Sequence, residues 1–265
     1  MKINIFLLIL VIFISWIMIV NMFKENFEPT PDFASKTQNG VKNKLKLAIL
    51  LTGRITNKPK YYENMIENLA QGRHEDVDFY ICYQKNSNPE YIEYVKKKYN
   101  PIKIKENDEK FDHSLVNKDY ATITPVDRPY NAMSSFRSRK LAMDMLKETS
   151  KKYDAIIWTR MDILFHSSVP YDLVLPKINQ NILCFPDGKD FHGINDELVI
   201  GNEKTMEIYA SVFDRAEDYL KTEKSKFNPE QLVLTHLNEN KMEYYKFYLV
   251  VELVRNDDFS TGKVW

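Results

Sequence analysis

The fold of this chain is decided by the stretch Tyr153-Asp-Ala-Ile-Ile-Trp-Thr-Arg-Met-Asp-Ile-Leu164. Its central part, Ala155 to Thr159, is apolar or β-branched without alternation, which is typical of a strand that is covered on both faces. Arg160 and Asp162 follow at the carboxyl end, and side chains two residues apart in an extended chain point to the same side. Because ligands of open α/β sheets bind beyond the carboxyl ends of strands, we expect a site here.

The spacing of Arg160 and Asp162 leaves two interpretations open. A carboxylate at a strand end can bind a divalent cation through oxygen, and a neighbouring arginine can hold a phosphate group. Alternatively, the two side chains form an ordinary ion pair, which is a common feature of protein surfaces and contributes little energy.

The amino-acid composition argues against some classes of protein function. The chain has 265 residues, enough for one large domain or two small ones, and its hydrophobic content of 44% is that of a globular protein with a full core. Its 37 basic residues balance 37 acidic residues, which argues against a nucleic-acid-binding protein with a broad basic surface. The sequence contains no glycine-rich phosphate loop of known pattern, and its two cysteines, Cys82 and Cys184, form no metal-thiolate pattern.

The first 44 residues differ from the rest of the chain. Ile3 to Val20 carries no charge, and at about 1.5 Å per residue it is long enough to cross a bilayer core of roughly 30 Å. A cleaved signal peptide is the competing interpretation, but no small-residue cleavage site follows, so we expect an uncleaved transmembrane anchor over residues 1–22. The positive-inside rule favours a cytoplasmic amino terminus, as in a single-pass type II membrane protein. Residues 23–44 are polar and would form a stem before a domain over residues 45–265.

Within that domain, predicted strands alternate with predicted helices, which favours an α/β fold with a mostly parallel sheet. We expect strands over residues 47–52, 77–82, 101–105, 155–159, 181–185, 198–200 and 245–254. We expect helices over residues 61–70, 89–98, 131–150, 203–219 and 229–237, and an irregular region over 106–130.

Arg139 lies in the middle of the apolar face that the helical spacing predicts for residues 131–150. An unpaired charge at such a position is costly. Either the side chain extends to the rim of the apolar face, or it has a buried acidic or phosphate partner.

Four stretches resemble one known family. The pattern Tyr153-Asp154-x5-Arg160-x-Asp162 resembles a strand of GT-A-type glycosyltransferases, particularly those of lipopolysaccharide and capsular polysaccharide synthesis, with R-x-D in place of their D-x-D signature. Three further stretches resemble the same group in the same order: Leu51-Thr-Gly-Arg54, Asn131-Ala-Met-Ser-Ser-Phe-Arg-Ser138 and Gly193-Ile-Asn-Asp-Glu-Leu-Val-Ile-Gly201.

The resemblance implies a GT-A-like sheet flanked by helices and the activity of a glycosyltransferase, of hexosyltransferase type. Its substrates would be a nucleotide-diphosphate sugar donor and a glycan or lipid-linked acceptor. It also implies Mn²⁺ or Mg²⁺ on the diphosphate, with Asp162 in the role of the last aspartate of D-x-D. The predicted donor-binding residues are Thr52, Gly53, Arg54, Arg139 and Arg160.

An inverting sugar transfer needs a carboxylate that takes the proton from the acceptor hydroxyl, although the sequence does not decide between inversion and retention. Asp196 is the predicted base, with Glu197 second; alternatively, Asn195 or Asp196 caps the next element. His236 is a candidate second metal ligand, although a lone histidine is more often structural.

Two other function classes stay open. A catalytically silent, membrane-anchored domain that binds a nucleotide or a glycan would share the same fold. A metal-dependent phosphoesterase would need more clustered histidine and aspartate than five scattered histidines provide.

Overall fold

The computed structural model describes residues 45–55, 60–72, 76–85, 87–108, 127–221 and 228–254. The predicted anchor and stem, at residues 1–44, lie outside these ranges. Among the described helices, none is both long and apolar enough to cross a bilayer.

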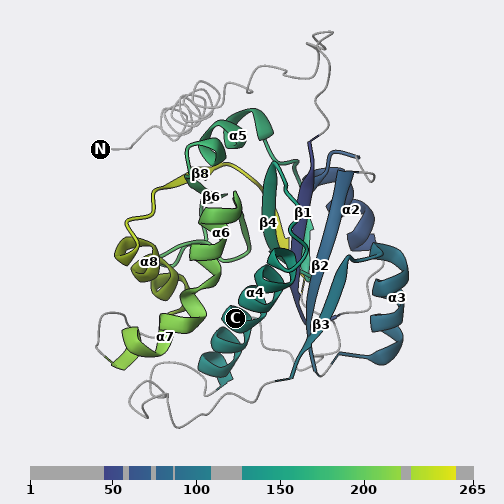
Figure 1. Cartoon of the computed structure of the whole chain (residues 1–265), viewed down its shortest axis with the longest axis horizontal. Helices are drawn as coiled ribbons and strands as arrows, with labels where there is room; N and C mark the ends of the chain where they lie inside the picture. The colour runs from purple at the N-terminus through teal and green to yellow at the C-terminus, as the bar shows by residue number, and fades with distance from the viewer. Residues whose placement is uncertain are drawn as a thin grey trace, which may run out of the picture. The chain divides into compact units, whose positions relative to one another are not determined.

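A seven-stranded sheet with the order β3-β2-β1-β4-β7-β6-β8 forms the centre of the domain (Figure 1). The strands of this sheet are β1 (Leu47–Gly53), β2 (Val77–Gln84), β3 (Lys103–Asn107), β4 (Ala155–Arg160), β6 (Leu183–Pro186), β7 (Leu198–Gly201) and β8 (Tyr244–Phe247). Only β7 is antiparallel to its neighbours β4 and β6. The prediction of a mostly parallel sheet is confirmed.

Helices cover both faces of this sheet. The described helices are α2 (Lys60–Leu69), α3 (Pro89–Tyr99), α4 (Asp127–Lys147), α5 (Tyr171–Asn179), α6 (Glu203–Ala210), α7 (Val212–Lys221) and α8 (Pro229–Glu239). One hydrophobic core lies under α4, α6, α7 and α8, and a second lies under α2, α3 and α5. Side chains of β4 enter both cores: Ile156 and Trp158 the first, Ala155 and Ile157 the second. This two-sided burial explains why the strand is apolar without alternation.

The first two residues of the quoted stretch hold the amino end of the sheet together. The Tyr153 hydroxyl donates a hydrogen bond to Asp78 Oδ2 at 2.7 Å and lies 2.8 Å from the Tyr80 hydroxyl. Asp154 Oδ2 accepts a hydrogen bond from the backbone N–H of Lys46 at 2.7 Å. Tyr153 and Asp154 are therefore structural, at the opposite end of β4 from Arg160.

The single helix expected over residues 203–219 is wrong, because the chain is interrupted at Ser211 between α6 and α7. His236 of α8 lies at this interruption. Its Nε2 lies 2.8 Å from the carbonyl oxygen of Ile208, and Nδ1 lies 2.9 Å from the Tyr219 hydroxyl. Since a carbonyl only accepts, Nε2 carries the ring proton, and Ile208 is bonded to a side chain at the point where the helix breaks.

The single strand expected over residues 245–254 is also wrong. Its first part is β8, which pairs with β6 in the large sheet. Its last part, β9 (Val251–Leu253), pairs instead with β5 (Ile163–Phe165) in a separate two-stranded sheet. The intervening residues leave the large sheet, and Tyr248 among them is 81% exposed. Strand-forming residues continue through this change of partner, so the sequence pattern does not reveal it.

His236→Gln should remove one part of the pH dependence of stability. Burial lowers the pKa of His236, so the unfolded chain binds a proton at a higher pH than the folded chain does. The free energy of unfolding should therefore fall as the pH falls below about 6.5. Urea denaturation at pH 7 and pH 5.5 measures this slope, which should be smaller in the variant. Equal slopes would show that His236 titrates alike in both states.

Candidate functional site

A cavity of about 1010 Å³ opens where β1 and β4 end. These two strands are parallel neighbours, and Thr52 lies opposite Arg160 in their register. Along the sheet, β2 and β3 lie on one side of β1 while β4 lies on the other, so this is the point at which the strand order reverses. Open α/β sheets bind ligands at such points, beyond the carboxyl ends of the strands.

Most of the residues that line this cavity are polar or charged. The lining residues are Thr52, Gly53, Arg54, Gln84, Asn131, Ala132, Ser135, Phe136, Ser138, Arg139, Arg160, Asp162, Lys189, Phe191, Asp196, Glu197, Asn228, Pro229, Glu230 and Leu253. Every site residue predicted from the sequence is among them, with the single exception of His236.

His236 is not brought to the cavity. The structure buries its ring against Tyr219, Ser211 and the carbonyl of Ile208, beside the break between α6 and α7. These contacts are those of a structural histidine. They do not place His236 in the metal site for which the sequence made it a candidate ligand.

The end of β1 exposes backbone to the cavity. Gly53 has a φ of +121°, and a Cβ at this position would meet nothing within 4 Å. Any other residue would be strained there, while glycine leaves room for a ligand to approach the main chain. The side chain of the preceding Thr52 is fixed, because its Oγ1 accepts a hydrogen bond from Trp158 Nε1 at 3.0 Å.

Arg160 and Asp162 form a two-bonded ion pair in the wall of the cavity. Arg160 Nε and one of its terminal nitrogens each donate to a carboxylate oxygen of Asp162, both at 2.8 Å. The predicted common direction of the two side chains is therefore confirmed. They are 35% and 24% exposed, so a ligand in the cavity can reach both groups.

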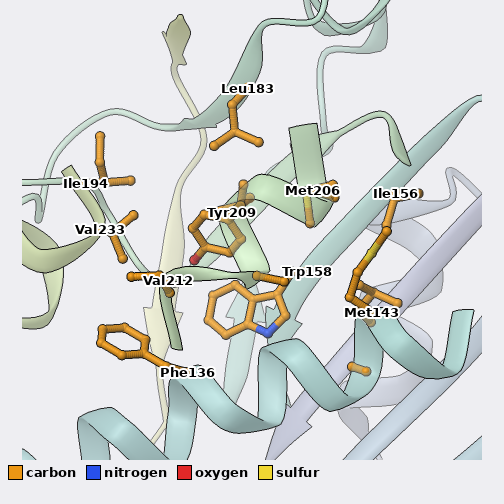
Figure 2. Close-up of a cluster of buried hydrophobic side chains, with 14 of the residues drawn as sticks. Phe136, Met143, Ile156, Trp158, Leu183, Ile194, Met206, Tyr209, Val212 and Val233 are labelled. Carbon is orange, nitrogen blue, oxygen red and sulfur yellow. The ribbon is translucent and has the colours of Figure 1, made fainter. Parts of the chain in front are cut away.

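Arg139 is buried with an acidic partner, which decides between the two alternatives for this residue. It is 1% exposed, and its guanidinium carbon lies 4.1 Å from the centre of the Trp158 ring. Figure 2 shows the surrounding aromatic cluster, with Phe136 on α4 and Tyr209 on α6 beside Trp158. The guanidinium donates to Tyr209 Oη at 2.6 Å and to Asp196 Oδ2 at 3.0 Å.

The segment that carries the two predicted bases is held by Asn195. Its side chain accepts the backbone N–H of Glu197 at 2.9 Å and donates to the carbonyl of Gly188 at 2.8 Å. Thr159 Oγ1 donates to the carbonyl of Glu197 at 2.9 Å. The alternative role of a local backbone cap thus applies to Asn195, whereas Asp196 pairs with Arg139.

Glu197 is a cavity carboxyl with a shifted pKa. Burial raises its pKa above the ordinary range, although the ammonium of Lys189, 3.2 Å and 3.3 Å from its two oxygens, opposes the shift. Perturbed titratable groups in a cleft are candidates for proton transfer. Within the described residues Arg54 has no ion pair, so it is available to an anionic ligand.

Gly193 allows this segment to approach α8. A Cβ at Gly193 would lie 2.1 Å from the carbonyl carbon of Glu230, a distance that real atoms do not reach. The backbone N–H of Ile194 donates to the oxygen of the same carbonyl at 3.1 Å. The glycine that opens the fourth quoted stretch therefore sets the position of Asp196 and Glu197 relative to α8.

Sequence reasoning missed Lys189 and Phe191, which line the cavity just before this stretch. Neither has a spacing signal, because the loop that carries them has no regular period. Gln84, at the end of β2, was also missed, although the carboxyl end of a strand next to β1 is where a site residue is expected.

Whether Asp162 can bind a divalent cation depends on the hydrogen bonds that its carboxylate already accepts. Both of its oxygens are occupied by Arg160, and the described part of the chain contains no group of three metal-ligating side chains. Each carboxylate oxygen has a second lone pair, so a Mn²⁺ or Mg²⁺ at Asp162 would share the carboxylate with the Arg160 guanidinium, whose positive charge opposes the binding of a cation.

No family model matches the chain, and no curated protein matches its sequence. Among solved structures, it is similar to a protein named a nucleotide-diphospho-sugar transferase from Desulfovibrio desulfuricans G20, with 14% identity, coverage of 76% of this chain and 79% of the other, and a TM-score of 0.43. A nucleoside-diphosphate-sugar pyrophosphorylase from Vibrio cholerae RC9 is 11% identical, with 76% and 92% covered and a TM-score of 0.46. The apo-form glycosyltransferase GlyE of Streptococcus pneumoniae TIGR4 is 14% identical, with 76% and 45% covered and a TM-score of 0.40. These values establish neither a family nor an activity, so the functional argument rests on the site.

Gly193→Ala should destabilise the protein strongly, because the added methyl group collides with the backbone of α8. We expect a loss of about 3 kcal/mol or more in the free energy of unfolding, measured by urea denaturation. Gly72→Ala is the control without a collision: Gly72, unlike Gly193, has a positive φ, of +76°, and a Cβ there meets nothing within 4 Å. The control should lose about 1–2 kcal/mol, the cost of the left-handed conformation alone. Equal losses in the two variants would contradict the close approach at Gly193.

Proposed function

We propose that this protein is a glycosyltransferase that transfers a sugar from a nucleotide-diphosphate sugar to an acceptor hydroxyl. One observation carries the proposal: a single cavity at the reversal point of the sheet combines an open backbone at Gly53, the cations Arg54 and Arg160, and the carboxylates Asp196 and Glu197. Its volume of about 1010 Å³ is that of a site for a ligand larger than a single sugar.

The proposed role of the arginines is to bind the diphosphate. Breaking the bond between sugar and phosphate leaves negative charge on the diphosphate. A guanidinium that is already in place donates hydrogen bonds to this charge and stabilises it without reorganisation. Arg160 offers a planar fork that binds phosphate as well as it binds Asp162. In this proposal the diphosphate takes the guanidinium of Arg160 from Asp162, and Arg54 adds a second charge. No step depends on a metal ion.

The proposed general base is Glu197 ahead of Asp196, which reverses the order expected from the sequence. Asp196 is the acidic partner of a buried guanidinium, so protonating it would leave the charge of Arg139 uncompensated. Glu197 has a raised pKa, and a base whose pKa is closer to the working pH removes a proton more effectively.

The finer parts of the proposal rest on the quoted sequence patterns. A hexosyl group as the transferred sugar and a glycan or lipid-linked acceptor follow from the resemblance to polysaccharide-synthesis transferases. The apolar segment at residues 1–22 would hold the domain at a membrane, where a lipid-linked acceptor is available.

A second candidate is the catalytically silent nucleotide- or glycan-binding domain. The observation that favours it is the balance of charge in the cavity, where Asp162, Asp196 and Glu197 are each paired with a basic side chain. Incubation of the chain with a panel of nucleotide sugars separates the two candidates, since only an enzyme releases free nucleotide.

Asp162→Asn should strongly lower the release of nucleotide from the donor, because it removes the charged partner that holds the Arg160 guanidinium in the cavity wall. The thermal midpoint should stay within a few degrees, because the carboxylate is partly exposed. Asp214→Asn is the matched control: it breaks a comparable ion pair, with Lys140 at 2.8 Å, outside the cavity wall. The control should retain wild-type turnover. Full activity in Asp162→Asn, or unfolding of that variant, would remove Asp162 from the site.

Glu197→Gln should lower the rate of sugar transfer by about 10²- to 10⁴-fold with little change in donor affinity. In the wild type, protonation of Glu197 removes the base, so the rate should fall as the pH falls through its pKa. Because that pKa is raised, the acid limb should lie above the range of an exposed glutamate. The pH dependence of donor turnover measures both effects. A wild-type rate in the variant would show that Glu197 is not the general base and would leave Asp196 as the candidate.

A further inference from the structure

Phe191 stands out in the cavity wall because its ring is 62% exposed, the largest exposed fraction among the large hydrophobic side chains that line the cavity. It belongs to the loop that connects β6 to β7, here called the 187–193 loop. A single exposed apolar side chain is common on protein surfaces and needs no special cause. The backbone of this loop, however, is unusual.

Three non-glycine residues of the 187–193 loop have a positive φ: Lys189 at +49°, Phe191 at +43° and His192 at +68°. Each such residue costs about 1–2 kcal/mol relative to an ordinary conformation. Strain of this kind persists only where the surrounding structure imposes it, and it is found most often at ligand sites.

The loop is fastened to the rest of the domain at several points. Asp190 Oδ2 accepts a hydrogen bond from Lys246 Nζ at 2.6 Å, and the carbonyl of Phe191 accepts one from Asn228 Nδ2 at 3.3 Å. Lys189 Nζ donates to the carbonyl of Val251 at 3.1 Å in addition to binding Glu197. These contacts hold the backbone in place while leaving the Phe191 ring without cover.

We propose that Phe191 is the platform on which a sugar ring of the acceptor stacks. The proposal deepens the proposed function and rests on it. One face of a pyranose ring presents C–H groups that pack on an aromatic ring, while its hydroxyls need polar partners of the kind that the rest of the wall provides. The proposed base is close in the chain, since Lys189, two residues before Phe191, binds the Glu197 carboxylate.

The position of the loop favours the acceptor over the nucleotide. The proposed phosphate-binding groups lie at the ends of β1 and β4. The 187–193 loop enters from β6 and β7, which lie on the other side of β4 in the sheet. In this proposal the diphosphate of the donor and the sugar of the acceptor therefore bind to opposite walls of one cavity.

Saturation-transfer NMR tests the proposal with the full chain, in the presence of uridine diphosphate and millimolar methyl glycosides of glucose, galactose, mannose and N-acetylglucosamine. We expect transfer to the ring protons of at least one glycoside, reduced about three- to tenfold in Phe191→Ala and retained in Phe191→Trp. Tyr248→Ala is the matched control, because it removes an aromatic ring that is 81% exposed but does not line the cavity. It should leave the signal unchanged.

Three results would overturn the proposal: no glycoside contacts the wild type, Phe191→Ala gives the wild-type signal, or Phe191→Ala weakens nucleotide affinity alone. The last result would place a nucleobase on the ring. Nucleotide release from donor sugars, measured on the same samples, tests the proposed function separately. If Phe191→Ala loses the glycoside signal but no donor is turned over, Phe191 binds a sugar ring as proposed, and the proposed transferase activity is wrong.

Discussion

Parallel pairing of β1 with β4 is the constraint on which the site depends. The two strands are far apart in the sequence, yet their register places Thr52 beside Arg160 and so brings Gly53 and the Arg160–Asp162 pair to one edge of the sheet. The pairing is possible because both strands are apolar on both faces and are covered by a separate core on each side. The carboxyl ends of the two strands then lie at the cavity, where a ligand can bind.

The buried guanidinium of Arg139 joins α4 to three other parts of the domain. It extends from α4, stacks on Trp158 of β4, and bonds to Tyr209 of α6 and to Asp196. Loss of one partner from such a pair costs about 3–5 kcal/mol, because a charge is left uncompensated in the core. Arg139 therefore contributes to the site mainly by fixing the segment of Asp196 and Glu197, and less as a group that binds the donor directly.

Much of the fold was predictable because it depends on local patterns. The strands of the parallel part and the helices α2, α3 and α8 follow from the local pattern of apolar residues. The break at Ser211 was not predictable, because the side chain that bonds to the chain at this point, His236, is distant in the sequence. The separation of β8 from β9 likewise depends on the choice of partner strand, and residue propensity does not encode that choice.

The same distinction applies to the site. Gly53, Arg160 and Asp162 were found because a strand end is visible in the sequence, and Asp196 and Glu197 because they precede a buried strand. The partners of these groups were invisible, since Lys189 and Phe191 lie in an irregular loop and ion pairing is set by tertiary packing.

The most direct measurement is a crystal structure of the protein soaked with uridine or guanosine diphosphate. The account predicts that the diphosphate lies at the ends of β1 and β4, against the Gly53 backbone, with the Arg160 guanidinium turned from Asp162 to a phosphate oxygen. A diphosphate bound elsewhere, with the two bonds between Arg160 and Asp162 intact, would contradict it.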